Sequence, residues 1–219
     1  MITTEHMDRA ILPDQRLLRA YDRLAPTYAF RHQRWLRFAG GEAQAALEAA
    51  VRMVLASGST ILDAGAGTGQ FARSLLSEGF PPEQITLLDP SRAMLEYCDD
   101  IPVTKTLGRI EEMPFANRSF DVVTCAWALE VVTQPDLALS ELCRVLKIGG
   151  VLCLTFCAQA PLRDLVDWAM RSAVKLRGTG NFLQTFDVIA ALQETMPCEV
   201  QIMPCSGPAA TIIARRLAA

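Results

Sequence analysis

The sequence predicts an α/β protein built on a mostly parallel sheet. From residue 60 onward, short apolar runs alternate with segments whose apolar residues recur at helical spacing. The first, fourth and fifth of these runs are almost continuously apolar, which is typical of parallel strands covered by helices on both faces. In addition, the first run leads into a glycine-rich turn followed by a helical pattern, an arrangement that α/β sheets use to bind nucleoside ligands.

The expected elements follow in order along the chain. One or two helices, broken near Pro26, cover residues 14–38, and another helix covers 42–56. Strands are expected at 60–64, 85–88, 103–107, 120–125 and 151–156, and helices at 70–78, 92–98, 136–146 and 186–195. Two last strands follow at 199–202 and 210–214, and the first of these alternates polar with apolar residues as an edge strand does.

No linker divides the chain, so we expect one domain over residues 1–219. Its parts are a helical cap (1–56), a ligand-binding core (57–157), a lid or acceptor segment (158–185) and a closing helix with strands (186–219). Residues 161–177 have helical spacing with mixed charges. They are expected to form an amphipathic helix over the sheet, a lid, or a peripheral membrane contact.

Composition excludes several function classes. The net charge of −3 and the interspersed basic residues disfavour a nucleic-acid partner. No apolar run approaches the roughly 18 to 20 residues of a membrane span, and residues 1–15 do not resemble a signal peptide, so we expect a cytoplasmic protein. The seven cysteines form no C-x-x-C pair, which favours reduced thiols and no metal site. A thiophilic site at Cys125 and Cys157 is the weaker alternative.

The glycine-rich turn is the most informative segment. Its spacing is Gly65-x-Gly67-x-Gly69, and Gln70 stands where the third glycine of a dinucleotide fingerprint would fall. Asp63, at the end of the preceding strand, would repel a pyrophosphate but could hold an ammonium group. These features disfavour a nicotinamide-dependent oxidoreductase. They favour a ligand with adenosine at one end and an amino acid at the other, which describes S-adenosylmethionine.

The turn and four later segments resemble the motifs of the class I S-adenosylmethionine-dependent methyltransferases, in particular the small-molecule enzymes similar to those of ubiquinone and menaquinone biosynthesis. The resemblance implies a Rossmann-like, seven-stranded sheet whose last strand is antiparallel, and S-adenosylmethionine as the cofactor. The segments that carry it are 61–71, 87–95, 109–115, 119–125 and 141–150.

Two carboxylates and the glycines are the main candidates for cofactor binding. We expect Asp63 to hold the methionine ammonium and Asp89, at the end of the second strand, to accept the ribose hydroxyls. A helix-capping acid and a turn acid are the respective alternatives. Gly65, Gly67 and Gly69 allow the backbone to approach the ligand closely. The remaining candidates are Ala64, Pro90, Met94, Ile110 and Ala126.

Arg109 departs from the family pattern, which often has an acid in the adenine loop. Either the adenine is held more loosely, or the alignment is displaced by one residue. We therefore assign adenine contact to Ile110 and none to Arg109.

Tyr21 and Tyr28 are further candidates for cofactor binding, because they belong to a segment that resembles one that many relatives place over the cofactor. Acceptor-side candidates are fewer. His32 and Glu130 are candidate general bases, with a surface or core histidine and a solvated helix residue as the alternatives. Trp127 either walls the acceptor pocket or belongs to the core.

The resemblance implies in-line methyl transfer to a small-molecule acceptor, without nucleic acid. A water-soluble metabolite ranks first as acceptor, and a quinone or lipid head group ranks second. A hypothesis from another class is a non-catalytic S-adenosylmethionine-binding partner of an active enzyme. The sequence does not indicate the acceptor atom or the oligomeric state.

Overall fold

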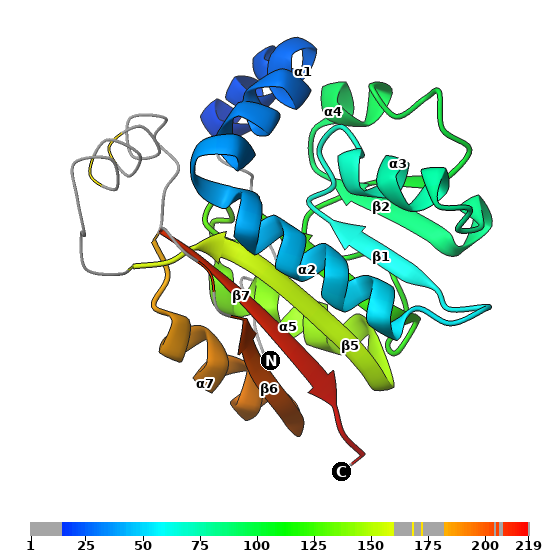
Figure 1. The fold of residues 1–219 in the computed structure, drawn as a ribbon, viewed down its shortest axis with the longest axis vertical. Helices are drawn as coiled ribbons and strands as arrows, with labels where there is room; N and C mark the ends of the chain where they lie inside the picture. The colour runs from blue at the N-terminus through cyan, green and yellow to red at the C-terminus, as the bar shows by residue number, and fades with distance from the viewer. Residues whose placement is uncertain are drawn as a thin grey trace, which may run out of the picture.

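The structure, a computed structural model, describes residues 15–159, 168, 172, 182–203, 205 and 208–218. Within these residues the chain forms one seven-stranded sheet with the order β3-β2-β1-β4-β5-β7-β6 (Figure 1). The strands are β1 (Ile61–Ala64), β2 (Ile85–Asp89), β3 (Thr104–Leu107), β4 (Phe120–Ala126), β5 (Leu146–Cys157), β6 (Cys198–Met203) and β7 (Ala209–Arg216).

The strand directions confirm the predicted architecture. Strands β1 to β5 pair in parallel with one another, whereas β7 pairs antiparallel with both β5 and β6. The last strand of the chain is therefore the antiparallel one, and β6 lies at the sheet edge. Its alternating sequence predicts this position, because only one face of the strand packs against the core.

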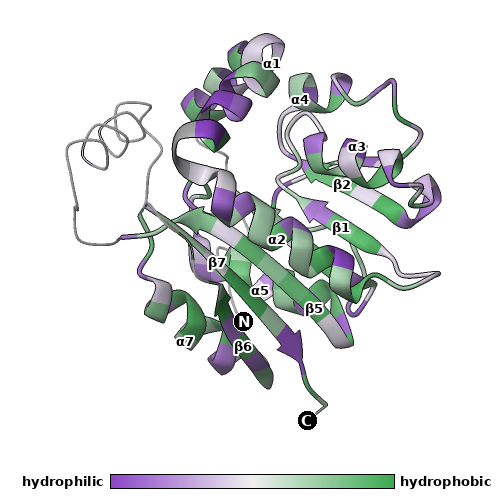
Figure 2. Ribbon diagram, in the orientation of Figure 1, coloured by the Kyte–Doolittle hydropathy of each residue, from purple (hydrophilic) through white to green (hydrophobic). Residues whose placement is uncertain are grey.

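Helices cover both faces of the sheet. On one face, α2 and α3 contribute Leu47, Val51, Phe71 and Leu75 to a buried cluster with β1 and β2. On the other face, α5 and α7 pack against β4, β5 and β7. In Figure 2, β5 and β7 are green over most of their length, whereas α1 mixes purple with green. The helices are α1 (Gln15–Trp35), α2 (Gly41–Val54), α3 (Gln70–Ser77), α4 (Arg92–Glu96), α5 (Pro135–Val145) and α7 (Thr185–Thr195), with a 3-10 turn η2 (Pro82–Gln84).

Helix α1 corrects one prediction. It continues through Pro26 as a single 21-residue helix, and a π-helical turn, η1 (Leu36–Gly40), joins it to α2. A proline inside a helix costs about 3 kcal/mol, because it removes one hydrogen bond and crowds the preceding turn. Packing offsets this cost, since Ala25 is buried and Tyr21 and Tyr28 lie at the centre of the site described below.

The expectations for residues 161–177 fall almost entirely outside the described residues. In the part of the chain that the structure describes, no helix combines the length and apolar character needed to cross a membrane.

Candidate active site

The loop between β1 and α3 forms a glycine cradle. All three glycines have positive φ, with values of 78° at Gly65, 55° at Gly67 and 70° at Gly69. A Cβ at Gly65 would lie 2.5 Å from the Cβ of Ala128, and one at Gly67 would lie 3.2 Å from the ring of Tyr28. Side chains at these positions would fill the space above the loop, so the glycines keep it open.

Asp89 holds this loop from the neighbouring strand. Its carboxylate accepts hydrogen bonds from the backbone N–H of Gly67 and the backbone N–H of Ser91, both at 2.8 Å. Burial raises the pKa of Asp89 to about 6, although the hydrogen bonds from Ser91 and Gly67 act in the opposite direction. One carboxylate thus fixes both the glycine cradle and the start of α4.

Asp63 is the second buried acid at this end of the sheet. Its Oδ1 accepts a hydrogen bond of 2.8 Å from the hydroxyl of Thr124 on β4. Burial raises the pKa of Asp63 to about 6, the hydrogen bond from Thr124 lowers it, and the charges of Asp89 and Glu48 raise it further. A cation bound beside Asp63 would stabilise its ionised form.

Three cavities adjoin at the carboxyl ends of the strands, and we name each by what lines it. The loop cavity contains the cradle and Asp89, the acid cavity contains Asp63, and the cap cavity lies under α1. Tyr28 and Trp127 line all three. The loop cavity is also lined by Pro90, Met94, Arg109, Ile110 and Glu111. The acid cavity is also lined by Gln44, Thr68 and Ala126. The cap cavity is also lined by Leu17, Leu24, Arg31, His32, Trp35, Glu130 and Cys157.

Trp127 lies at the junction of these cavities in a left-handed backbone conformation, with φ of 58°. This conformation is rare for a bulky residue, and the surrounding contacts hold it. The indole Nε1 donates a 2.8 Å hydrogen bond to Oε1 of Gln44, and the ring meets Trp35 edge-on at 5.7 Å between centroids. A Cβ at Gly40 would clash with both indoles, at 2.7 and 2.8 Å.

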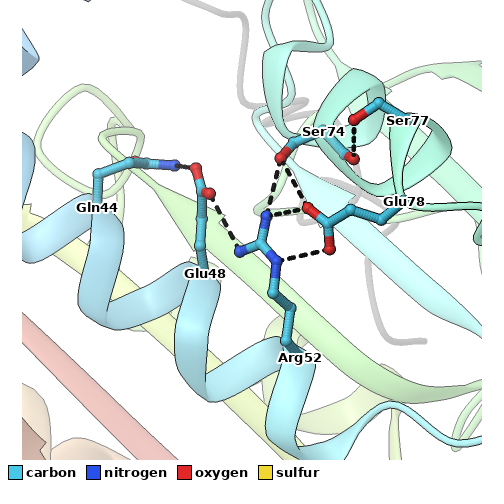
Figure 3. Close-up of polar contacts among 6 residues, drawn as sticks. All are labelled: Gln44, Glu48, Arg52, Ser74, Ser77 and Glu78. Atoms are coloured by element: carbon cyan, nitrogen blue, oxygen red, sulfur yellow. Dashed lines mark hydrogen bonds and ion pairs between the residues drawn. The ribbon is translucent and has the colours of Figure 1, made fainter.

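Gln44 begins a chain of polar contacts along α2 that reaches α3 (Figure 3). Its Nε2 donates to Glu48 at 2.9 Å, and Arg52 donates to Glu48 at 3.1 Å. Arg52 also donates to both carboxylate oxygens of Glu78, at 2.6 and 2.8 Å, and to Ser74 at 2.8 Å. This chain orients the Gln44 amide so that its oxygen faces Trp127.

Helix α1 brings the predicted aromatic residues together over the cradle. The rings of Tyr21 and Tyr28 lie 6.3 Å apart, and the imidazole of His32 stacks on Tyr28 at 5.7 Å with an interplanar angle of 7°. Burial lowers the pKa of His32, and the charge of Glu48 partly opposes this effect.

A side-chain hydrogen bond links α1 to the segment between β2 and α4. The hydroxyl of Ser91, the N-cap of α4, donates to Asp22 at 2.6 Å and accepts from the backbone N–H of Met94. The cap and the Asp89 loop are thereby linked through one serine.

Glu130 corrects another expectation. It is not a solvated helix residue but lies in a turn after β4, with an exposed fraction of 5%. Its Oε2 has no hydrogen-bond partner among the described residues. Burial raises the pKa of Glu130 to about 7, although hydrogen bonding from Cys157 acts in the opposite direction.

In the adenine-loop segment, Ile110 is buried and lines the loop cavity. Arg109 donates to Glu111 at 2.8 Å and to Thr133 at 2.9 Å. The backbone N–H and hydroxyl of Thr133 donate to the same Glu111 oxygen, at 3.0 and 2.9 Å. The acid of this loop therefore lies at position 111, and neighbouring donors occupy one of its oxygens.

Two of the predicted cofactor-binding residues do not line a cavity. Ala64 and Gly69 line none of the three cavities found among the described residues. Ala64 is fully buried in the core, and a Cβ at Gly69 would meet the sulfur of Cys98 at 2.9 Å. Their geometry therefore supports loop packing rather than ligand contact. Cys157 lines the cap cavity but Cys125 does not, so these two thiols share no described cavity.

Comparison with known proteins shows which family and which solved structures the chain is similar to. Residues 62–154 match the model of a methyltransferase domain family. The ubiquinone/menaquinone biosynthesis C-methyltransferase UbiE of Bordetella parapertussis is 34% identical over 145 residues, which cover 63% of this chain and 52% of that protein. The UbiE protein of Brucella abortus is 34% identical over 131 residues, covering 54% and 49%. The chain thus spans about half the length of these curated relatives.

Two solved structures share the fold. A Thermotoga maritima protein described as an S-adenosylmethionine-dependent methyltransferase and possible histamine N-methyltransferase has a TM-score of 0.67 and 20% identity, covering 90% of this chain and 99% of that chain. A chain from the complex of the Haloferax volcanii Trm112 activator with a putative methyltransferase has a TM-score of 0.72 and 17% identity, covering 90% and 98%. Residues 62–154 thus match a methyltransferase domain family, and the fold of the chain is shared with solved proteins described as methyltransferases.

Proposed function

We propose that this protein transfers a methyl group from S-adenosylmethionine to a small-molecule acceptor in the cytoplasm. The observation that carries the proposal is the pair of buried carboxylates, Asp63 and Asp89, on either side of an open glycine cradle. When bound, S-adenosylmethionine supplies a methyl group activated by a positively charged sulfur.

The loop cavity fits the adenosine half of the cofactor. Asp89 reaches this cavity from the end of β2, where its oxygens can accept from ribose hydroxyls. Pro90, Met94 and Ile110 provide apolar surface for the adenine ring. The cradle at Gly65 and Gly67 would allow the ligand to lie against the backbone.

The acid cavity fits the amino-acid half. Asp63 would pair with the ammonium group, and Ala126 contributes the adjacent wall. The hydroxyl oxygen of Thr68 is buried and has no hydrogen-bond partner among the described residues. Thr68 lines this cavity next to the N-terminus of α3, so it is suited to bind the carboxylate.

The catalytic work of the chain is then mainly positional. Methyl transfer needs the acceptor and the methyl carbon in line and close together, and a general base only when the acceptor arrives protonated. Trp127 lines both the cofactor cavities and the cap cavity, so it would align the two reactants. His32 and Glu130, which line the cap cavity, remain our candidate bases.

A quinone-type acceptor is the second candidate. It is favoured by the similarity to the UbiE C-methyltransferases and by the apolar and aromatic lining of the cap cavity. A lipid head group is the related alternative, and residues 161–177, for which the sequence predicts a possible membrane contact, lie outside the described residues apart from 168 and 172. A non-catalytic role as the S-adenosylmethionine-binding partner of another enzyme is the alternative outside this class.

Incubation with methyl-labelled S-adenosylmethionine and fractionated cell extracts tests the proposal. We expect labelled product in fractions of low molecular mass, and its structure would identify the acceptor. The Asp63→Asn/Asp89→Asn double variant is the matched control for label transferred by other enzymes. Tight cofactor binding without labelled product across many extracts would instead support the non-catalytic role.

A further inference from the structure

The cap cavity combines aromatic walls with one buried acid. Trp35 and Trp127 meet edge-on at 5.7 Å, and Tyr21 and Tyr28 approach from α1. Glu130 lines the same cavity with an exposed fraction of 5%. Such walls suit a flat ring, because aromatic pairs gain from edge-on and offset contacts.

An unpaired buried carboxylate oxygen is costly to keep. Burying a polar atom without a hydrogen-bond partner costs roughly 1–3 kcal/mol, and more for an ionised group. Oε2 of Glu130 has no hydrogen-bond partner among the described residues, so the hydrogen bonding from Cys157 leaves one oxygen of this carboxylate unpaired. A ligand that donates to Glu130 would remove the cost, so the site is complete only when such a ligand is bound.

The charges in the cavity decide what kind of donor fits. Arg31 lines the cavity, and its positive charge would repel a cationic amine but stabilise the negative charge that a hydroxyl gains as it loses its proton. A neutral hydroxyl can therefore donate to Glu130 without this repulsion. The other titratable groups that the described residues bring to the cavity are His32, Tyr21, Tyr28 and Cys157.

We propose that the cap cavity binds the methyl acceptor as an aromatic hydroxyl compound whose O–H donates to Glu130. This inference rests on the proposed methyltransferase function and specifies its acceptor. As the acceptor reacts, the hydroxyl proton passes to a carboxylate oxygen of Glu130, and the electron pair of the broken O–H bond stays on the acceptor. The electron-rich oxygen is then the nucleophile. It would bond to the methyl carbon as the bond from that carbon to sulfur breaks, and the electron pair of the broken bond would stay on sulfur. The proton leaves Glu130 for solvent after the product departs.

Binding of simple probes tests this proposal without turnover. We would titrate the full-length protein, saturated with S-adenosylhomocysteine, with 4-ethylphenol, 4-ethylanisole and 4-ethylbenzylamine by calorimetry. The phenol should bind about tenfold more tightly than the anisole, which has the same ring but no O–H. At pH 7 binding of the phenol should also release a fraction of a proton, because the phenol selects the ionised form of Glu130, whose pKa is about 7.

Three variants separate this role from a structural one. Glu130→Leu should reduce the phenol-to-anisole ratio to about one, and Glu130→Gln should abolish the proton release. Both should unfold at a temperature no lower than the wild type at pH 8, because they remove an unpaired buried charge. Glu112→Gln, at an exposed glutamate that lines none of the described cavities, should leave every quantity unchanged.

Equal affinity for the phenol and the anisole in the wild type would overturn the proposal, and so would an unchanged ratio in Glu130→Leu. Tighter binding of the amine than of the phenol would show that the cavity prefers a cationic ligand to a hydroxyl, and this result would also overturn the proposal. Failure of the methyltransferase function is a separate outcome, because it would appear either as absent binding of S-adenosylhomocysteine in the preceding titration or as absent labelled product in the extract experiment.

Discussion

The loop cavity and the cap cavity lie side by side but are built in different ways. In the loop cavity, backbone geometry sets the shape: Gly65 and Gly67 have positive φ, and Asp89 accepts from two backbone N–H groups. In the cap cavity, side chains from distant segments set it, and Trp127 depends on Gln44, 83 positions away in the sequence. A short sequence motif predicts the first kind of site, whereas the second kind depends on tertiary packing.

The largest effect should separate the cavities proposed for the cofactor, the loop cavity and the acid cavity, from the cap cavity. Asp63→Asn keeps the side-chain shape but removes its charge, so affinity for S-adenosylhomocysteine should fall roughly 10- to 100-fold by calorimetry. Binding of 4-ethylphenol to the cap cavity should not change. Asp136→Asn, at an exposed acid on α5, is the control and should bind as the wild type does. A parallel loss at both cavities would show that they are not independent.

Next in size is the effect of filling the cradle. In Gly65→Ala the new methyl group would lie 2.5 Å from the Cβ of Ala128. Gly58 also has a positive φ, 87° against 78° at Gly65, but a Cβ there would have nothing within 4 Å. Both substitutions, Gly65→Ala and Gly58→Ala, should lower the free energy of unfolding by about 1–2 kcal/mol, because alanine would have to adopt a left-handed backbone conformation. Gly65→Ala should lose about 1–3 kcal/mol more through overpacking. Urea unfolding would measure the difference, and equal losses would mean that Ala128 moves away freely.

On the cap side, Gln44→Leu should leave the indole N–H of Trp127 unpaired. The expected loss of unfolding free energy is about 1–3 kcal/mol, accompanied by a change in tryptophan fluorescence. Gln193→Leu, on the exposed face of α7, provides the control. Unaltered stability and fluorescence in Gln44→Leu would show that the chain of contacts in Figure 3 does not hold Trp127.

The smallest effect is the pH dependence of cofactor binding. Burial raises the pKa of Asp63 and of Asp89 to about 6, so both are ionised at pH 7 and protonated at pH 5. Pairing with the ligand ammonium requires ionised Asp63, so affinity for S-adenosylhomocysteine should be constant above pH 7. It should fall as the pH drops through 6, by at most about tenfold per pH unit for one group.

The stability of the free protein should respond in the opposite direction. A carboxyl whose pKa is raised by folding destabilises the folded state above that pKa, so protonation between pH 7 and pH 5 relieves the cost. The difference in melting temperature between Asp63→Asn and the wild type should therefore shrink over this range. Affinity that stays constant down to pH 5 would show that Asp63 does not bind a cation.

Local patterns predicted most of the fold. The strand and helix bounds agree within two residues, except that α1 ends at Trp35 rather than at residue 38 and that β5 begins at Leu146 rather than at residue 151. The break at Pro26 was wrong because tertiary packing holds α1 together. The motif predicted that Asp63 and Asp89 lie beside the cradle, because a strand end fixes where its next side chain points.

The rest of the site is not a local property. The burial of Glu130 depends on α1 and β5, which lie far from it in the sequence. The contact of Ser91 with Asp22 spans 69 positions, and no periodicity signals it. Gln44 looks like an ordinary helix residue, and only its distance to the indole of Trp127 reveals its role.

The most direct measurement of the central claim is a pair of calorimetric titrations of the wild-type protein, one with S-adenosylhomocysteine and one with NAD, repeated on Asp63→Asn/Asp89→Asn. We expect saturable binding of S-adenosylhomocysteine by the wild type, none of NAD, and loss of binding in the double variant. Binding of NAD alone, or undiminished binding of S-adenosylhomocysteine by the double variant, would contradict the account.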